Sequence, residues 1–155
     1  MNHDYQTQLD QAWVGERRGE VFFSAVAEHT SDPAMKSKWT DLAELERRVG
    51  TALERLVDIQ QIPVETLSME MAGREFAAAS VNESLASITE VIDTAVETYN
   101  AMRDTGPAEH ATELDILARH EIALQTFVRC ELAGQSDSSM DEVTQLLQEL
   151  RASQS

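Results

Sequence analysis

The chain has 155 residues, which is long enough for one domain with a substantial hydrophobic core. Its residues are 42% apolar and 26% charged, with only six Gly and three Pro, and this composition favours an ordered, helix-rich protein over a disordered one. The net charge of −16 argues against nucleic acid and anionic membrane surfaces as partners.

Apolar residues repeat with an α-helical period along most of the chain. Asp32 is suited to cap a helix that begins at Pro33, and Gly134 is suited to end one. The turn at 105–107 contains Gly106 and Pro107 and is the clearest in the chain. The pattern predicts helices over residues 4–29, 33–60, 74–104, 108–133 and 140–152.

The longest predicted connection covers residues 61–73 and contains Pro63 and Gly73. Fully extended, it reaches about 43 Å, slightly more than the roughly 38 Å length of a 25-residue helix. Partial helix formation would shorten it. The four long helices therefore predict an all-α four-helix bundle over residues 1–134, with either a simple up-and-down topology or one crossover. Residues 135–155 are predicted to form a polar hinge and a short amphipathic helix.

Three polar residues interrupt the apolar faces of three predicted helices. Glu46 lies on the axis of its apolar stripe, where a carboxylate costs several kcal/mol unless it is paired, protonated or bound to a cation. Glu16 and Glu46 lie 16 and 14 residues from Asp32, and His120 lies 14 residues beyond Gly106. Antiparallel helices with short links place such positions at similar heights. We therefore predict that Glu16, Glu46 and His120 meet at the middle of the bundle.

Other ionisable residues are predicted to have smaller roles. Glu20 is about 40° from the axis of its stripe and could join the cluster as an accessory ligand. Glu121 is about 100° from His120, so we expect it to contact a neighbouring helix or solvent, with accessory metal binding as the alternative. Solvated positions are predicted for Glu131 and for three histidines near helix ends, His3, His29 and His110.

Three short segments resemble the rubrerythrin-type members of the ferritin-like superfamily. They are Gly15-Glu16-Arg17-Arg18-Gly19-Glu20-Val21-Phe22-Phe23-Ser24-Ala25-Val26-Ala27, Leu42-Ala43-Glu44-Leu45-Glu46-Arg47-Arg48-Val49 and Leu117-Ala118-Arg119-His120-Glu121. The resemblance implies a ferritin-like bundle. It also implies two metal ions, generally iron, held by a Glu on each of two helices and a Glu-x-x-His on each of the other two.

Only part of that ligand set is present in this chain. Glu16 and Glu46 match two of the family's glutamates, and His120 matches one histidine. Val49 stands at the position of the other histidine, and Leu117 at the position of a further glutamate. A two-metal centre needs several oxygen and imidazole donors, so the resemblance predicts a degenerate di-iron site.

The third predicted long helix does not supply the missing carboxylate. Its glutamates repeat every seven residues on the side opposite the apolar stripe, so they are predicted to face water: Glu83, Glu90 and Glu97. The residues expected nearest the core at that level are Ile88, Val91 and Ile92.

Three interpretations of the Glu16, Glu46 and His120 cluster remain open. It is a hydrogen-bonded structural cluster, a site for one iron, manganese or zinc ion, or an unconventional two-metal or catalytic site. Arginines beside the two glutamates are expected at the surface, although one turned inward would neutralise a carboxylate: Arg17, Arg18, Arg47 and Arg48.

The leading functional hypothesis is a non-enzymatic bundle protein that binds at most one metal and forms homo-oligomers through its helix faces. The first alternative is a metal-dependent oxidoreductase, or an iron-handling or oxidative-stress protein, with a remodelled carboxylate site. The second is a carrier of apolar small molecules. Cys130 is the single cysteine and no apolar leader or 18-residue apolar run is found, so we expect a soluble, cytoplasmic protein.

Overall fold

The computed structural model describes residues 3–155, and all regular secondary structure in that part of the chain is helical. The prediction of an all-α protein is therefore confirmed. The α-helices are α1 (His3–Glu28), α2 (Pro33–Leu53), α3 (Leu67–Ala78), α4 (Val81–Thr105), α5 (Ala111–Leu132) and α6 (Asp141–Ser153). Short 3₁₀ helices cover Glu54–Leu56, Ile59–Gln61, Ala108–His110 and Ser136–Ser138.

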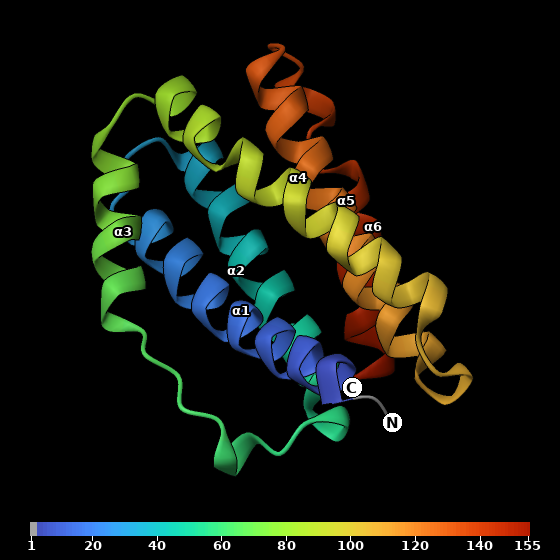
Figure 1. Ribbon diagram of the computed structural model, residues 1–155. Coiled ribbons are helices and arrows are strands. Elements are labelled where there is room, and N and C mark those ends of the chain that lie inside the picture. Colours follow the sequence, from blue (N-terminus) through green and yellow to red (C-terminus); the bar gives the residue numbers. More distant parts are fainter. Residues whose placement is uncertain (1–2) are drawn as a thin grey trace.

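The long helices form two hairpins, and the chain between the hairpins runs back along the length of the molecule (Figure 1). Helices α1 and α2 form one antiparallel pair, and α4 and α5 form the other. Helix α3 runs back along α1, so α2 and α4 point in the same general direction. The topology is therefore the crossover alternative, and α3 provides most of the return.

Helix α2 ends at Leu53, seven residues before the predicted end at Gln60. The chain tightens into a 3₁₀ turn at 54–56 and becomes extended at Val57. The side chain of Asp58 then accepts a hydrogen bond from the backbone N–H of Gln60, which favours a turn over a continued helix. Leu56 remains in the core despite this change, which explains why its apolar spacing suggested a longer helix.

The predicted helix over 74–104 is two helices, because the chain breaks at Ala79 and Ser80. The Ser80 side chain caps α4 by accepting from the backbone N–H of Glu83, and the spacing of these two residues is that of a capping box. The Ser84 hydroxyl donates to the Phe76 carbonyl at 2.7 Å and joins the two helices. Val81, the first residue of α4, is exposed.

Helix α3 approaches α1 closely at Gly73. An added Cβ at this glycine would lie 2.6 Å from the Phe22 carbonyl oxygen and 2.8 Å from the Ala25 Cβ. Neither of these atoms can move without shifting α1, so only glycine allows this spacing. Gly73, which was predicted to lie in the connection over residues 61–73, is thus a packing residue of α3.

An aromatic cluster joins α1, α2, α3 and α5 at one end of the molecule. Trp39 is its centre: its ring stacks on Phe23 and meets Phe76 and Phe127 edge-on, with centroid distances of 6.0, 5.4 and 5.3 Å. Such pairs add about 0.5–1.5 kcal/mol each beyond the effect of burying their apolar area. Phe23, Trp39 and Phe127 are buried in the core, as is Trp13.

The loop before α5 buries a histidine that the sequence placed in solvent. His110 is only 8% exposed, and its Nδ1 lies 2.9 Å from the hydroxyl of Tyr5. The loop folds as a 3₁₀ turn that brings this ring against α1, a long-range contact that residue spacing does not reveal. His29 is exposed as predicted, and the side chain of His3 lies outside the described part of the structure.

Helix α6 packs against α2 and α5 through four buried residues, Val143, Leu146, Leu147 and Leu150. Gly134 ends α5 with φ of 76°, as expected for a C-cap. The following segment, predicted to be a polar hinge, contains a 3₁₀ turn, and Ser139 is 1% exposed.

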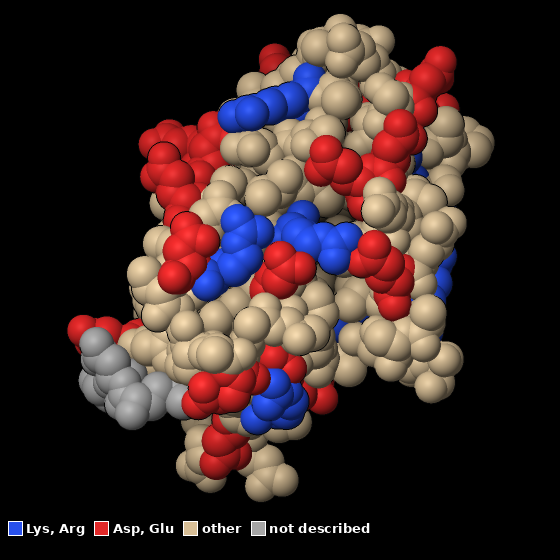
Figure 2. All heavy atoms as spheres, turned by 90° about the vertical axis from the view of Figure 1, so that its right-hand side faces the viewer, with Lys and Arg blue, Asp and Glu red and all other residues tan. Residues whose placement is uncertain are grey.

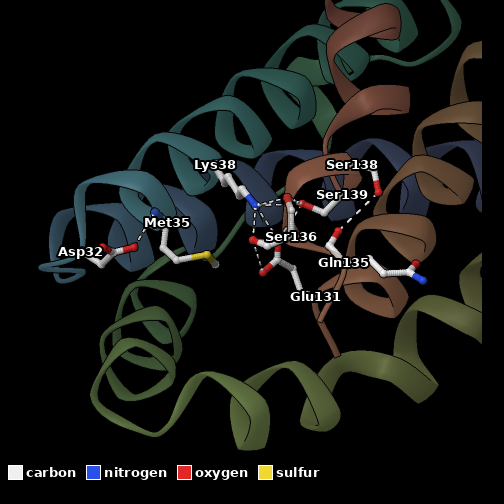
Figure 3. A network of polar contacts seen from close by, with 8 residues as sticks. All are labelled: Asp32, Met35, Lys38, Glu131, Gln135, Ser136, Ser138 and Ser139. Carbon is white, nitrogen blue, oxygen red and sulfur yellow. Dashed lines mark hydrogen bonds and ion pairs between the residues drawn. The ribbon is translucent and has the colours of Figure 1, made fainter. Parts of the chain in front are cut away.

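A lysine cluster of Lys38, Glu131, Ser136 and Ser139 holds that segment (Figure 3). Lys38 Nζ donates to Glu131 at 2.6 Å, to the Ser136 carbonyl and hydroxyl at 2.7 Å each, and to Ser139 at 2.9 Å. The Glu131 side chain is only 7% exposed, so its predicted position in water is wrong. A partner 93 residues earlier in the chain supplies its counter-charge.

Charges of both signs are interspersed on the face in Figure 2, where basic side chains lie among acidic ones. Arg119 contributes to this pattern by pairing with Glu149 at 2.8 Å and with Asp115 at 3.9 Å. The net negative charge is therefore partly compensated on this face. As predicted, the glutamate stripe of α4 is exposed.

Acid should weaken the contact between α2 and α6 through Glu44. Hydrogen bonds from Arg151 and Arg48 lower the pKa of Glu44 from 4.5 to about 2. This stabilisation is present above pH 4.5 and is lost as pH falls towards 2. We expect Glu44→Gln to cost about 1 kcal/mol at pH 7 and almost nothing near pH 2, measured by urea unfolding at each pH. The same cost at both pH values would contradict the assignment, and Glu97→Gln is the exposed control.

Candidate metal centre

Glu16, Glu46 and His120 converge from α1, α2 and α5 in the interior of the bundle. They are 2%, 5% and 0% exposed. His120 Nε2 lies 2.9 Å from Glu16 Oε1 and 3.6 Å from Glu46 Oε2. One ligand atom from each residue lies within 4.8 Å of the other two. The predicted meeting of these three side chains is confirmed, and we call them the Glu/Glu/His cluster.

Two glycines make room for the carboxylates where α1 and α2 face each other. Gly19 of α1 faces Glu46, and an added Cβ there would lie 2.9 Å from the Glu46 Cδ. Gly50 of α2 faces Glu16 reciprocally, with a Cβ position 3.4 Å from the Glu16 Cβ. Each helix therefore places its glutamate opposite a glycine of the other, which holds both carboxylates near the contact between the two helices.

The orientation of His120 suits a metal ligand. Its Nδ1 lies 2.6 Å from the Leu117 carbonyl oxygen, one turn earlier on α5. Since a carbonyl only accepts, Nδ1 carries the proton, and in the neutral ring Nε2 presents its lone pair to the glutamates. Among the described residues, Glu16 Oε2 is buried without a hydrogen-bond partner, and the partners within reach of Nε2 are carboxylate oxygens. If Nε2 is unprotonated, its lone pair faces the lone pairs of the carboxylate oxygens with no proton between them.

Burial and mutual charge shift the pKa values in this cluster. Burial, followed by the charge of Glu16, raises the pKa of Glu46 well above its usual value. Burial alone would lower the pKa of His120, but the charge of Glu16 and contacts with Glu121 and Glu46 raise it well above its usual value. The metal-free cluster therefore favours an imidazolium and a protonated carboxyl, which reduce the unbalanced negative charge.

Glu121 belongs with the cluster, contrary to the expectation that it would face another helix or solvent. It is 7% exposed, and its Oε2 lies 3.2 Å from His120 Nε2. Glu121 and His120 point in directions about 100° apart around α5, but the glutamate side chain is long enough to reach the imidazole ring. Burial raises its pKa, with the interaction with His120 opposing that rise. Glu20 is partly exposed and lies 3.7 Å from Arg17 instead of joining the cluster.

The arginines beside the glutamates do not neutralise the cluster. Arg17 pairs with Glu20, Arg48 pairs with Glu44, and Arg47 is exposed. Among the described residues, no arginine or lysine forms an ion pair with a cluster carboxylate. His120 is thus the cationic partner that the fold provides.

Apolar residues occupy the positions from which a second metal would need ligands. Val49 and Leu117 are fully buried in the core. The α4 glutamates are exposed and point away, and Tyr99 is the α4 residue beside the cluster, with its ring 6.2 Å from that of His120. Burial raises the pKa of Tyr99, so it remains a neutral hydroxyl at physiological pH. The donors present suit one ion and do not suit two.

The cluster borders a cleft of about 370 Å³ that is lined by residues of α1 and α4, among others. Glu46 and Glu121 contribute to its lining, and most of the other lining residues are apolar. Val91 stands beside it and is 70% exposed, so its predicted place near the core is wrong. The position of this cleft could not be predicted from residue spacing, because it lies between two helices that are distant in the chain.

Comparison of the chain with protein-family models, curated proteins and solved structures finds no match. Interpretation of the site therefore depends on its own geometry. Among the described residues, no helix combines the length and the apolar character needed to cross a membrane.

Proposed function

We propose that this chain is a ferritin-like bundle protein that binds one divalent metal ion through Glu16, Glu46 and His120. The observation that carries the proposal is the convergence of three buried side chains whose ligand atoms lie within 4.8 Å of one another. In addition, Glu16 Oε2 is buried without a hydrogen-bond partner among the described residues. Such groups are costly to bury, and a cation shared between them removes that cost. In this proposal the site retains one metal position of a two-metal arrangement.

The spacing of the donors supports a single small ion. Ligands about 2.1 Å from one ion lie about 3.0–3.5 Å apart in octahedral or tetrahedral geometry. The separations of 2.9 and 3.6 Å from His120 Nε2 to the two carboxylates are close to this range. Two carboxylates and one imidazole suit iron, manganese or zinc, and Glu121 can serve as a further oxygen ligand or as a hydrogen-bond acceptor.

The chain topology and the short motifs support the ferritin-like part of the proposal. Bundles of that type have one long crossover connection between their two helical hairpins, which corresponds to the segment containing α3. The cluster residues come from three of the four long helices. The missing donors at Val49 and Leu117 distinguish the proposed site from an intact two-metal centre.

Metal retention by Glu46→Leu tests the proposal. The protein is loaded with Fe(II) under anaerobic conditions, or with Mn(II) or Zn(II), then desalted and measured by elemental analysis. We expect about one ion per wild-type chain and no retained ion in the variant. The metal-free variant should be equally stable or about 1–3 kcal/mol more stable, because a buried carboxylate is replaced by an apolar side chain of similar size.

Glu97→Leu is the matched control, since it removes the same charge from an exposed position of α4. This control should retain the ion. His120→Ala should lose it. No retained ion in the wild-type protein at any loading would reject the metal site and leave a structural cluster held by an imidazolium. Two ions per chain would reject the single-metal assignment.

A further inference from the structure

The cleft beside the Glu/Glu/His cluster has walls of consistent chemistry. Phe22 of α1, Ile88 and Ile92 of α4 and Leu124 of α5 give it an apolar surface, and Met69 of α3 lies at one side. Its volume of about 370 Å³ is within the range of small-molecule sites, which is roughly 300–1,000 Å³. An apolar body of small size therefore fits this space.

Arg18 places a positive charge in the lining of the same cleft. Its Nε is buried and has no hydrogen-bond partner among the described residues. Its Nη2 makes only a long contact of 3.4 Å with the Ser68 hydroxyl. Glu65 is close enough for the two charges to influence each other, but its carboxylate is engaged by the backbone N–H and hydroxyl of Ser68. Arg18 thus retains donor capacity for an anion.

The other charged residues of the lining have different partners. Glu46 and Glu121 lie next to His120. If the proposed function is correct, the bound metal ion would also neutralise the charge of Glu46. The inference rests on the proposed function only for this neutralisation of Glu46. With those carboxylates engaged, Arg18 is the charged group of the lining that remains to select a ligand.

We propose that the cleft between α1 and α4 binds a small amphipathic carboxylate. Its carboxylate pairs with Arg18, and its apolar body lies between Phe22, Ile88, Ile92 and Leu124. The guanidinium suits this partner because it donates two parallel hydrogen bonds to a carboxylate. Contact with the apolar walls favours binding, because it removes the apolar body of the ligand from water.

Calorimetric titration of the full chain tests the charge of the ligand. Octanoate, octan-1-ol and octylamine serve as probes, because they share an eight-carbon body and differ in the head group. We expect one octanoate per chain, with the alcohol and the amine binding at least about tenfold more weakly, since a charge-assisted hydrogen bond contributes about 1.5–3 kcal/mol. Tighter binding of octylamine would overturn the proposal and assign the cleft to a cation held by Glu46 and Glu121.

Two substitutions with opposite expected effects locate the head group. Arg18→Gln should weaken octanoate binding about tenfold or more and leave octanol unchanged. Glu65→Gln should strengthen octanoate binding, because it removes a negative charge near Arg18. Arg47→Gln is the control, since it removes an equal charge from an exposed position of α2. Equal octanoate affinity in wild type and Arg18→Gln would overturn the proposal, provided that circular dichroism shows the variant folded.

The metal and ligand proposals can fail separately. Arg18 is not a member of the Glu/Glu/His cluster, so Arg18→Gln should retain the metal. Octanoate binding that depends on Arg18 in a protein that retains no metal would reject only the proposed function. A wild-type chain that retains one ion but binds no octanoate would reject only the ligand. A dimer that Val91→Asp dissociates and octanoate does not would also reject the ligand, since a second copy would then cover the cleft.

Discussion

Replacing Trp39 by alanine is expected to lower the free energy of unfolding by about 3–5 kcal/mol, the usual cost of deleting a large buried aromatic side chain. Trp39 is 3% exposed and contacts three other aromatic rings, from α1, α3 and α5. Its removal leaves a cavity where four helices meet. For a chain of this length the midpoint of thermal unfolding should fall by roughly 10 °C or more.

The same substitution should loosen α3 more than the rest of the molecule. Phe76 is the α3 residue that contacts Trp39, and it also meets Phe22 of α1 edge-on, so the loss of Trp39 removes part of the packing that holds α3. Hydrogen exchange should therefore accelerate first in residues 67–78. Leu67→Ala removes an exposed apolar side chain and is the control, with an expected change within about 0.5 kcal/mol. A cost below about 1 kcal/mol for Trp39→Ala would contradict its central packing role.

The Glu/Glu/His cluster could be predicted because its members lie on long helices joined by short turns. Counting from the Asp32 cap and from Gly106 gives the height of each residue, and the apolar stripe gives its direction. Errors in the ends of the helices do not affect this count. Helix α2 is seven residues shorter than predicted, but Glu46 lies far from that end and keeps its position.

Features that depend on contacts between distant segments were missed. Glu131 and His110 have the spacing of helix-end polar residues, and their partners Lys38 and Tyr5 lie 93 and 105 residues away in the chain. The helical direction of Glu121 favoured a neighbouring helix or solvent over the accessory metal-binding alternative, but the length of its side chain brings its Oε2 within 3.2 Å of His120 Nε2. The break at Ser80 did have a local signal in its spacing to Glu83, but the continuous apolar pattern concealed it.

The two proposals place different demands on neighbouring residues of α1. An added Cβ at Gly19 would lie 2.9 Å from the Glu46 Cδ, so a larger residue there would displace the Glu46 carboxylate. Arg18, one residue earlier, lines the cleft and is left with donor capacity. A single turn of α1 therefore serves both the proposed metal and the proposed ligand. A glycine at this position lowers the helix propensity of the turn, since glycine is unfavourable inside a helix.

Replacing Lys38 by methionine is expected to cost about 3 kcal/mol, because it leaves the Glu131 carboxylate buried without its counter-charge. Burial would raise the pKa of Glu131, but the hydrogen bond from Lys38 and those from Ser139 and Ser136 keep it below its usual value. Methionine preserves the apolar length of the side chain, so the loss reports on the charge. Urea unfolding at pH 7 measures it.

The double variant Lys38→Met/Glu131→Gln completes a double-mutant cycle that measures the interaction free energy between the two charges. It removes both charges, so it should recover most of the stability lost in Lys38→Met, with an interaction energy of about 2 kcal/mol in the cycle. Lys36→Met, an exposed lysine on the same helix, should change stability by less than about 0.5 kcal/mol. Since the lysine cluster positions the segment that leads into α6, Lys38→Met should also expose residues 136–153 to faster hydrogen exchange. Unchanged protection there, together with additive costs of the two single substitutions, would show that α6 is held by its apolar contacts alone.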